Sequence, residues 1–585
     1  MPAPRRIAVI DRGKCIREKC GYLCRSICPP VRMGKDAIVI DDKGFPVIDE
    51  VLCTGCGLCP KKCPVSAIRV INLAGEAGEP IFQYGVNSFR LYNFALPKQS
   101  GVVALIGRNG IGKTTLLEIM SAKLLPNFMD FSKKLTIDEV ISRTAHRELK
   151  NYFEQVKSGG YKISYKVQNV ELLARLAPNS TVEEVLAEFD SSNRRASISD
   201  RLNMGGFIKS KLSSLSGGEL QKVAIAAAML REASLYFFDE PSIYLDIYER
   251  MRVAREIAFL SQSKPVIVVE HDLALLDYLA DYAYVLYGEP GVYGVVSGIK
   301  NARAGINEFM EGYLREENVR FRERALRIEL FSTSEVSKKV LFVYDSMEKS
   351  LGRFKLKVSG GDARRGEVIG IVGPNAIGKS TFIKLIAGVE KPDNGNAPTG
   401  LTVSYKPQYI DLGFEGTVQE FLLKNKIDQS YIKEFELEHL LFKRVPNLSG
   451  GEMQRLAIAY TLSADADIYL FDEPSAFLDI EQRMRLSTII KRDISEKEKV
   501  ALVVDHDLVF IDSIASRLIQ FSGQPSISGN ASSPLDKVDA MNSFLKELGI
   551  TLRRDKETLR PKINKEGSVL DREQREVGNY YYHVK

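Results

Sequence analysis

The feature that most constrains this chain is an ordered set of short motifs that occurs twice. A glycine-rich stretch, Gly107-Arg-Asn-Gly-Ile-Gly-Lys-Thr114, returns as Gly373-Pro-Asn-Ala-Ile-Gly-Lys-Ser380, and Leu215-Ser-Gly-Gly-Glu219 returns as Leu448-Ser-Gly-Gly-Glu452. The lysines of the first pair lie 266 residues apart and the serines of the second pair lie 233 apart. The chain therefore contains a duplicated domain, and the front of the first copy carries about 33 extra residues.

Each glycine-rich stretch has the context of a phosphate-binding loop. It follows a short apolar run typical of a strand, 102–106 in the first copy and 368–372 in the second, and precedes a helix-like segment. In such a loop backbone amides surround the phosphates, lysine reaches the β and γ oxygens, and threonine or serine binds Mg²⁺. We therefore expect ATP or ADP with Mg²⁺ at two sites. The predicted nucleotide-binding residues are Gly107, Asn109, Gly110, Gly112, Lys113, Thr114 and Thr115 in the first copy and Gly373, Asn375, Gly378, Lys379, Ser380 and Thr381 in the second.

The two loops differ at one glycine, because Ala376 stands where the first loop has Gly110. If the backbone there needs a positive φ, alanine is strained; otherwise the exchange is harmless. We expect a harmless exchange.

Further motifs repeat downstream of the loops. Apolar runs end in Asp-Glu-Pro at 239–241 and again at 472–474, and later apolar runs end just before His271 and His506. A continuous apolar run fits a strand that is buried on both faces of a parallel sheet. Ligands bind at the carboxyl ends of such strands, so these acidic and histidine residues are candidate site residues.

This motif set resembles that of the ABC-type ATPase superfamily over about residues 80–290 and 340–525. The resemblance implies two α/β P-loop cassettes in tandem that face each other head to tail. Each nucleotide then lies between the phosphate loop of one cassette and the signature sequence of the other. The residues assigned by the resemblance are Ser216, Gly217, Gly218, Ser449, Gly450 and Gly451 in the signatures; Thr114, Gln168, Asp239, Ser380, Gln408 and Asp472 as Mg²⁺-binding; Gln168 and Gln408 also as nucleotide contacts; and Glu240, Glu473, His271 and His506 as catalytic.

An aromatic residue upstream of the phosphate loop usually stacks on adenine in this superfamily. The candidates are Tyr84 and Phe89 in the first cassette and Tyr344 in the second. The alternative is that these rings are ordinary core or surface aromatics.

All eight cysteines lie between Cys15 and Cys63. The run Cys53-x2-Cys56-x2-Cys59-x3-Cys63-Pro64 has the spacing of a bacterial ferredoxin, in which the fourth cysteine binds the other cluster. Eight thiolates suit two [4Fe–4S] clusters, and zinc or disulfides are less favoured. A structural role for the clusters is favoured over electron transfer. The exchange of fourth ligands predicts one cluster on Cys15, Cys20, Cys24 and Cys63 and the other on Cys28, Cys53, Cys56 and Cys59.

The 585 residues are enough for several domains. The chain has no apolar run of ~18 residues and no signal-peptide core, so we expect a cytoplasmic protein that does not enter a membrane. The net charge of +6 neither indicates nor excludes a nucleic-acid partner. The predicted parts are a two-cluster ferredoxin-like α+β domain (1–75), a first cassette (76–293) with a helix–loop–helix insertion at about 118–165, a hinge (294–335), a second cassette (336–530) and a C-terminal hinge segment (531–585).

The insertion in the first cassette and the C-terminal tail also carry recognisable patterns. The insertion is predicted to contain a helix or helix pair over Thr136–Lys157, with Thr136 as the N-cap. One face of this segment is basic, and it is either an ordinary solvated surface or a contact arm for RNA or protein. The tail from Thr551 is basic and has three tyrosines near its end, Tyr580-Tyr-Tyr582, and these aromatics favour packing over disorder.

Two cassettes joined to a two-cluster domain without membrane helices resemble ABC subfamily E, the ribosome-recycling ATPases also known as RNase L inhibitor. The resemblance spans essentially the whole chain, and the compact loops favour an archaeal member. It implies a monomer with an intramolecular cassette pair that binds the ribosome, chiefly the small subunit, also near initiation. It further implies that this ATPase splits post-termination ribosomes with a release factor or its surveillance paralogue while the iron–sulfur domain swings. A transporter ATPase, a DNA-repair ATPase and an ATP-coupled electron-transfer enzyme are the alternatives.

Overall fold

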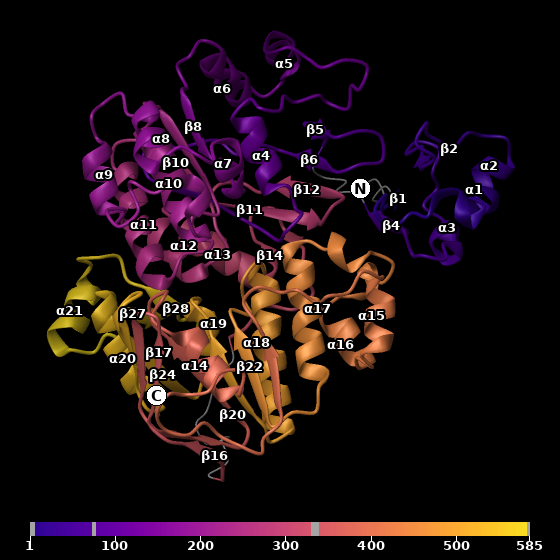
Figure 1. Cartoon of the computed structure of the whole chain (residues 1–585). Helices are drawn as coiled ribbons and strands as arrows, with labels where there is room; N and C mark the ends of the chain where they lie inside the picture. The colour runs from indigo at the N-terminus through magenta and orange to yellow at the C-terminus, as the bar shows by residue number, and fades with distance from the viewer. Residues whose placement is uncertain (1–5, 73–77, 329–338, 582–585) are drawn as a thin grey trace.

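The structure is a computed structural model that describes residues 6–72, 78–328 and 339–581. Figure 1 shows two cassettes stacked on each other, with the small N-terminal domain at one side of the seam and the C-terminal segment at the other side. Both chain segments that flank the cassettes therefore lie where the two cassettes meet.

The N-terminal domain combines short strands and short helices around its cysteines. Its elements are β1 (Arg6–Ile10), α1 (Leu23–Ile27), α2 (Pro29–Arg32), β2 (Ile38–Ile40), β3 (Pro46–Ile48), α3 (Leu58–Lys62) and β4 (Ile68–Asn72). Strand β1 pairs antiparallel with β4, and β2 pairs antiparallel with β3. The apolar core is small and includes Cys24 and Cys59 themselves. This is the α+β arrangement that the cysteine spacing predicts.

The first cassette is built on one mixed sheet with the strand order β5-β6-β12-β11-β7-β10-β9-β8 and with β13 paired to β11. Its strands are β5 (Phe82–Gln83), β6 (Arg90–Tyr92), β7 (Val102–Ile106), β8 (Ile163–Lys166), β9 (Leu235–Asp239), β10 (Val266–Val269), β11 (Tyr282–Glu289), β12 (Tyr293–Val296) and β13 (Lys300–Asn301). Its helices are α4 (Lys113–Met120), α5 (Ile137–Arg143), α6 (Arg147–Lys157), α7 (Glu171–Leu176), α8 (Val182–Phe189), α9 (Arg195–Arg201), α10 (Gly217–Leu230), α11 (Ile247–Ser261) and α12 (Leu273–Leu279).

The second cassette repeats this sheet with the order β17-β18-β25-β24-β20-β23-β22-β21 and with β26 paired to β24. Its strands are β16 (Val340–Tyr344), β17 (Met347–Leu351), β18 (Phe354–Val358), β19 (Gly361–Arg364), β20 (Glu367–Val372), β21 (Val403–Lys406), β22 (Ile468–Asp472), β23 (Val500–Val504), β24 (Arg517–Gln524), β25 (Ser528–Ala531) and β26 (Leu535–Asp536). Its helices are α14 (Lys379–Ile386), α15 (Val418–Lys424), α16 (Gln429–Glu434), α17 (Gly450–Ser463), α18 (Ile480–Glu496) and α19 (Leu508–Ile514). The duplication seen in the motifs is thus a duplication of the fold.

Hydrophobic strands at the centre of each sheet set the position of the sites. Every residue of β7, β9 and β10 is buried, as is every residue of β20, β22 and β23, and these strands pair in parallel. Parallel strands end at one edge, so the phosphate loops, the Asp-Glu-Pro turns and the histidines gather there. The expectation of buried parallel strands is confirmed.

The insertion in the first cassette forms the predicted helix pair, α5 and α6. Thr136 caps α5 with a reciprocal capping box to Glu139, and Gly159 has a left-handed backbone just after α6. Buried Tyr152 and Phe153 of α6 pack against the cassette core, while Arg143 forms an ion pair with Asp130. The helix pair is therefore a fixed projection, visible at the top of Figure 1.

Two segments connect the cassettes. The first contains α13 (Ala302–Glu311), β14 (Tyr313–Leu314) and β15 (Val319–Arg320), and the second contains α20 (Lys537–Leu548), β27 (Leu552–Arg554), β28 (Pro561–Ile563) and α21 (Val569–Val577). The expectation that the aromatic tail packs is confirmed at Tyr581, which is buried, whereas Tyr582 lies outside the described residues.

The hairpin of β27 and β28 forms ion pairs with an equivalent aspartate in each cassette. Asp277 in α12 and Asp512 in α19 each lie six residues after the histidine that precedes the helix. Arg560 contacts Asp277 through two nitrogens, at 2.8 and 2.9 Å, and these two side chains are almost completely buried. Arg554 contacts Asp512 at 2.9 Å, and Tyr581 donates its hydroxyl to the same carboxylate. One hairpin thus binds the equivalent aspartates of both cassettes.

We expect Asp512→Asn to destabilise the second cassette by about 3 kcal/mol at pH 7, because the change leaves Arg554 and Lys537 as buried cations without an anion. Burial would raise the pKa of Asp512, but Lys537 and Arg554 outweigh burial and hold it below its ordinary value. The wild-type carboxylate therefore contributes stability above a pH of about 4, and this contribution is lost as the pH falls through the lowered pKa. Urea unfolding at pH 7 and at lower pH measures this, and the deficit of the variant should shrink in acid.

The matched control is Asp465→Asn, because Asp465 is 99% exposed and lies 3.7 Å from Lys499. That change should alter the unfolding midpoint little at either pH. A deficit of Asp512→Asn that stays constant from pH 7 into acid would contradict the account of the buried ion pair.

Candidate active sites between the cassettes

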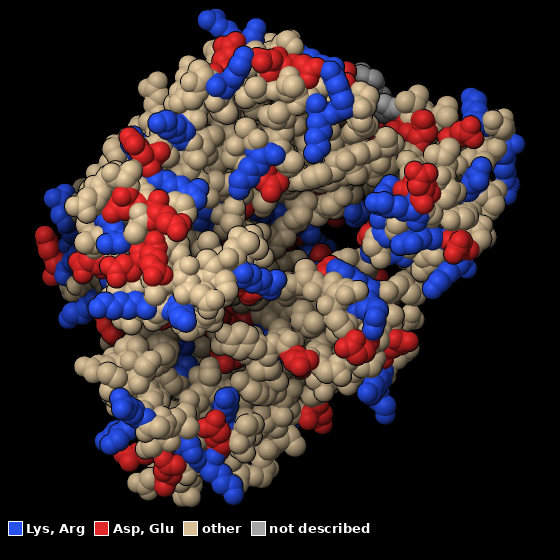
Figure 2. Space-filling model, turned by 45° about the horizontal axis from the view of Figure 1, so that its top comes forward, with Lys and Arg blue, Asp and Glu red and all other residues tan. Residues whose placement is uncertain are grey.

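A continuous cavity of about 1730 Å³ runs between the two cassettes and beside the N-terminal domain. Figure 2 shows a dark hollow between these parts, with lysine and arginine side chains near its rim. Ligand pockets for one small molecule are typically about 300–1,000 Å³, so this cavity has room for two. It is lined by the predicted residues of both sites except Gly107, Gly373, Asp239 and Tyr344.

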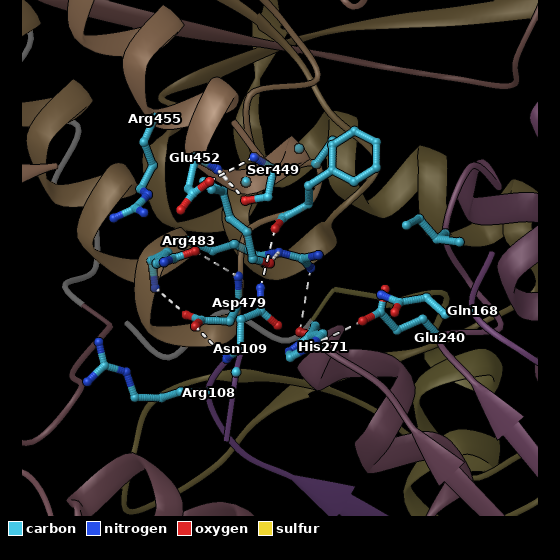
Figure 3. A pocket seen from close by; sticks show the side chains of 18 of the residues that line it. Arg108, Asn109, Gln168, Glu240, His271, Ser449, Glu452, Arg455, Asp479 and Arg483 are labelled. Atoms are coloured by element: carbon cyan, nitrogen blue, oxygen red, sulfur yellow. Dashed lines mark hydrogen bonds and ion pairs between the residues drawn. The ribbon is translucent and has the colours of Figure 1, made fainter. Parts of the chain in front are cut away.

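Hydrogen bonds across the interface arrange the cassettes head to tail. The backbone N–H of Asn109 donates to Asp479 Oδ2 at 3.0 Å, and the backbone N–H of Asn375 donates to Asp246 Oδ2 at 2.7 Å. Figure 3 shows the first of these bonds beside Ser449 of the opposite signature. Each phosphate loop therefore faces the signature of the other cassette.

Each signature serine begins a helix whose N-terminus opens on the cavity. Ser216 and Ser449 are N-caps with complete capping boxes, and Gly217 and Gly450 are the first residues of the 14-residue helices α10 and α17. The amides of a first helical turn have no partner within the helix, and the helix dipole favours an anion there. The signature helices thus present backbone donors to the cavity on the side opposite each phosphate loop.

The phosphate loops present a buried lysine and a hydroxyl next to an aspartate. Lys113 Nζ donates to the carbonyl oxygens of Gly107 and Arg108, each at 2.9 Å. Thr114 Oγ1 donates to Asp239 Oδ2 at 3.1 Å, and in the second site Ser380 Oγ donates to Asp472 Oδ2 at 2.8 Å. The two sites have the same chemistry at this point.

The expectation that Ala376 replaces glycine harmlessly is wrong. Gly110 has φ = 74° and Ala376 has φ = 55°, so the loop needs a left-handed backbone at this position in both cassettes. A left-handed residue with a Cβ costs about 1–2 kcal/mol. The second phosphate loop therefore carries strain that the first loop lacks.

The predicted catalytic glutamates lie beside His271 and His506. His271 Nε2 is 3.6 Å from Glu240 Oε1, and His506 Nε2 is 3.6 Å from Glu473 Oε1. Burial, reinforced by the phosphate-loop lysine, holds the pKa of each histidine well below its ordinary value. Both histidines are therefore neutral at physiological pH, and each can donate or accept a hydrogen bond.

Glutamine side chains complete this group of residues. Gln408 Nε2 donates to Glu473 Oε1 at 2.7 Å, and Gln168 lies beside Glu240 in the first site. Burial and then the adjacent aspartate raise the pKa of both glutamates. Figure 3 shows Gln168, Glu240 and His271 gathered on one side of the cavity, opposite Asp479.

The ion pairs of Arg108 across the interface have no counterpart in the second site among the described residues. Arg108 in the first phosphate loop lies 3.5 Å from Glu481 of the second cassette, and Arg322 of the first hinge lies 3.1 Å from the same carboxylate. The second loop has Pro374 at the position of Arg108. This difference is not among the features predicted from the sequence, although it is visible when the two loops are aligned.

The structure places the candidate aromatic residues differently in the two cassettes. Tyr84 is 55% exposed at the cavity with its hydroxyl 3.2 Å from Thr115 Oγ1, and Phe89 packs beside Gly112. The prediction for Tyr344 is wrong, because its ring is buried in the core against Phe382. Phe354 packs beside Gly378 as Phe89 packs beside Gly112, and the repeat offset of the two lysines points to within one residue of it.

The eight cysteines gather in two groups of four. One small cavity is lined by Cys15, Cys20, Cys24 and Cys63, and a second is lined by Cys28, Cys53, Cys56 and Cys59. The structure thus brings together the sets that the exchange of fourth ligands predicts. Backbone amides of Ala8 and Ala67 donate to sulfur atoms of Cys53 and Cys63, at 3.4 and 3.2 Å. Four thiols around a pocket, with amides directed at sulfur, fit an iron–sulfur cluster.

Hard oxygen atoms at each phosphate loop fit Mg²⁺. Asp239 is buried, and its Oδ1 has no hydrogen-bond partner among the described residues, while its Oδ2 accepts from Thr114. The equivalent pair in the second site is Asp472 and Ser380. A carboxylate and a hydroxyl beside a phosphate-binding loop are the ligands that Mg²⁺ uses in nucleotide sites.

Comparisons with known proteins agree with this geometry. The family model described as ABC transporter matches residues 92–243 and 356–476, and the one described as 4Fe-4S binding domain matches residues 46–69. Within the described residues, no helix combines the length and the apolar character that a membrane crossing requires.

Relatives cover almost the whole chain. An ABC transporter ATP-binding protein of Methanocaldococcus jannaschii is 49% identical and aligns with 99% of this chain and 97% of its own. Translation initiation factor RLI1 of Chaetomium thermophilum is 41% identical, with the same coverage. The two-cassette fold and the ferredoxin-like domain predicted from the sequence are confirmed.

Two solved structures are similar over most of their length. The chain aligned in a structure of ribosome-bound archaeal Pelota and ABCE1 has a TM-score of 0.92 and 48% identity, with 99% of both chains covered. The chain aligned in a complex of archaeal ribosomal stalk protein aP1 and archaeal ribosome recycling factor aABCE1 has a TM-score of 0.81 and 46% identity, and covers 86% of this chain and 99% of its own.

We expect Ala376→Gly to raise the thermal midpoint of the second cassette modestly. The backbone strain removed is about 1–2 kcal/mol, whereas glycine costs about 0.4–1 kcal/mol through the entropy of the unfolded chain. The reciprocal change Gly110→Ala should lower the midpoint of the first cassette. Calorimetry of the two variants checks both signs, and a loss of stability in Ala376→Gly would show that the left-handed backbone is not strained.

Proposed function

The chain belongs to the ABCE1/RLI family, and from that premise we propose that it is a ribosome recycling factor that uses ATP to split post-termination or stalled ribosomes into subunits. The observation that carries the proposal is the combination found in one chain: two complete nucleotide sites shared head to tail, beside a domain with two groups of four cysteines. A relative carries the name translation initiation factor RLI1, so the proposal extends to small-subunit binding near initiation.

Hydrolysis is assigned to residues that line the cavity. Glu240 would polarise a water molecule for attack on the γ-phosphate, and neutral His271 beside it would hold that water in line. Lys113 would neutralise charge on the β and γ oxygens. Thr114 and Asp239 would hold Mg²⁺, which neutralises charge on the phosphates. The second site would use the equivalent residues: Glu473, His506, Lys379, Ser380 and Asp472.

ATP binding would draw the cassettes together because each site is divided between them. The phosphates bind one cassette's loop, and the γ-phosphate also needs the amides at the N-terminus of the other cassette's signature helix. Hydrolysis removes that shared anion and weakens the closed state. Rigid cassettes joined by hinges turn this cycle into motion of the attached domains.

The N-terminal domain is the part proposed to move. The two groups of four cysteines would hold two [4Fe–4S] clusters, which would cross-link a domain with a small apolar core. Polar contacts help to dock the domain on the first cassette, among them Arg69 with Glu289 and Arg90 with Glu50. Such contacts can break and form again during a swing.

The partners proposed for this chain are those of its relatives. One similar structure is of archaeal Pelota and ABCE1 bound to the ribosome, and another is a complex with the ribosomal stalk protein aP1. We therefore infer the ribosome, and a release factor or its surveillance paralogue, as partners. The fixed helix pair of α5 and α6 is the proposed contact with the small subunit. We further propose that the chain acts as a cytoplasmic monomer.

The test is sedimentation of purified post-termination ribosomes with the protein, a release factor and ATP. We expect ribosomes to separate into subunits with the wild type and to remain intact with Glu240→Gln/Glu473→Gln, because that change removes the base but keeps the shape of both sites. A non-hydrolysable ATP analogue serves as a second control.

Ribosomes that stay intact with the wild type, together with protein that remains at the top of the gradient, would contradict the proposal. The next measurement would then be reduction of the clusters during ATP turnover, which tests the alternative of an ATP-coupled electron-transfer enzyme.

A further inference from the structure

The two predicted catalytic glutamates share an unfavourable backbone conformation. Glu240 has φ = 48° and Glu473 has φ = 49°, in the left-handed region that residues with a Cβ rarely adopt. Each glutamate is followed by a proline, Pro241 or Pro474, which further restricts its backbone. A strained residue keeps such a conformation only when surrounding contacts hold it.

A buried lysine supplies such contacts in both cassettes. Lys166 Nζ donates to the carbonyl oxygens of Asp239 and Glu240, at 2.8 and 3.2 Å. Lys406 Nζ donates to the carbonyl oxygens of Asp472 and Glu473, at 2.6 and 3.1 Å. The same arrangement therefore occurs twice in the molecule.

A glutamine from the signature helix supports the same carbonyl. Gln221 Nε2 donates to the Glu240 oxygen at 2.8 Å, and Gln454 Nε2 donates to the Glu473 oxygen at 2.6 Å. The backbone N–H of Glu240 donates to the Val269 oxygen at 2.9 Å. The peptide groups on both sides of the glutamate are thus fixed by the sheet, the lysine and the signature helix.

Lys166 and Lys406 lie outside the cavity between the cassettes. Lys166 ends β8 and is 2% exposed, Lys406 ends β21 and is 1% exposed, and neither borders the cavity where nucleotide would bind. A buried ammonium group is expensive, and here its close partners are backbone oxygens of the turn that carries the glutamate. The location is therefore suited to hold that turn and not to contact a substrate.

We propose that Lys166 and Lys406 are positioning residues for ATP hydrolysis, which fix the backbone of Glu240 and Glu473 so that each carboxylate points at the attacking water. This inference rests on the assignment of the two glutamates as general bases. It concerns hydrolysis alone and does not depend on the ribosome.

The first test is steady-state ATPase activity of the full chain without ribosomes. Lys166→Met/Lys406→Met should lower kcat by about ten-fold or more and leave KM for ATP within about two-fold, because the lysines act on an interaction used in the transition state. Lys300→Met is the matched control, since Lys300 is also a buried lysine but pairs with Glu316 and Glu317 near the first hinge. Its kcat should stay near that of the wild type.

The second test is a double-mutant cycle, which a merely structural role would not satisfy. In a Glu240→Gln/Glu473→Gln background the lysine changes should lower the residual rate no further, since the carboxylates they position are gone. Rate losses that multiply, or a raised KM with unchanged kcat, would overturn the proposal.

A third pair of variants covers the case in which the lysine variants do not fold. Gln221→Met/Gln454→Met removes the other donor to each glutamate oxygen without leaving a charge buried, and it should also lower kcat with KM little changed. An unchanged kcat in that protein would overturn the idea that these carbonyl contacts position the glutamates. Because no ribosome is present, failure here is distinct from failure of subunit splitting.

Discussion

The reciprocal hydrogen bonds between Asp479 and Asn109, and between Asp246 and Asn375, are the contacts on which the two sites depend. Each aspartate also caps the helix that follows it, α18 or α11, so its position is fixed within its own cassette. A carboxylate held at one cassette therefore sets the place of the phosphate loop in the other. One such bond forms at each site, from each cassette to the other. When the interface of one site closes, the interface of the other site is therefore brought close to its assembled position.

The C-terminal segment with β27 and β28 extends this coupling to the far side of the cassettes. The β27–β28 hairpin binds Asp277 and Asp512, and each of these lies six residues after His271 or His506, on the helix that follows the histidine. From inside the interface, Arg250 and Arg483 lie 3.5 Å from the carbonyl oxygens of His506 and His271 across it. The segment from each histidine to its aspartate is thus held by the opposite cassette at one end and by the β27–β28 hairpin at the other. This arrangement gives both sites a physical connection to a single hairpin.

Much of this architecture could be predicted because motifs with fixed local geometry occur twice at nearly constant offset. The loops, the signatures, the Asp-Glu-Pro turns and both cysteine sets lie where spacing placed them. Backbone conformation cannot be predicted in this way, since the sequence does not state φ, and the expectation for Ala376 fails for that reason. The prediction for Tyr344 fails because distance along the chain does not fix which face of a strand a ring occupies. Lys166 has no signal in the sequence because its partners are backbone oxygens, which leave no residue pattern.

The same structure indicates why two sites with identical catalytic groups need not behave alike. The first loop gains an ion pair across the interface through Arg108, and its glycine accepts the left-handed turn without strain. The second loop has Pro374 in place of that cation and Ala376 in place of that glycine. Both differences favour a more firmly assembled first site, and both lie in the loop, where phosphate binds, and not at the glutamate or histidine. Any inequality between the sites should therefore arise in nucleotide binding and closure before it arises in the chemical step.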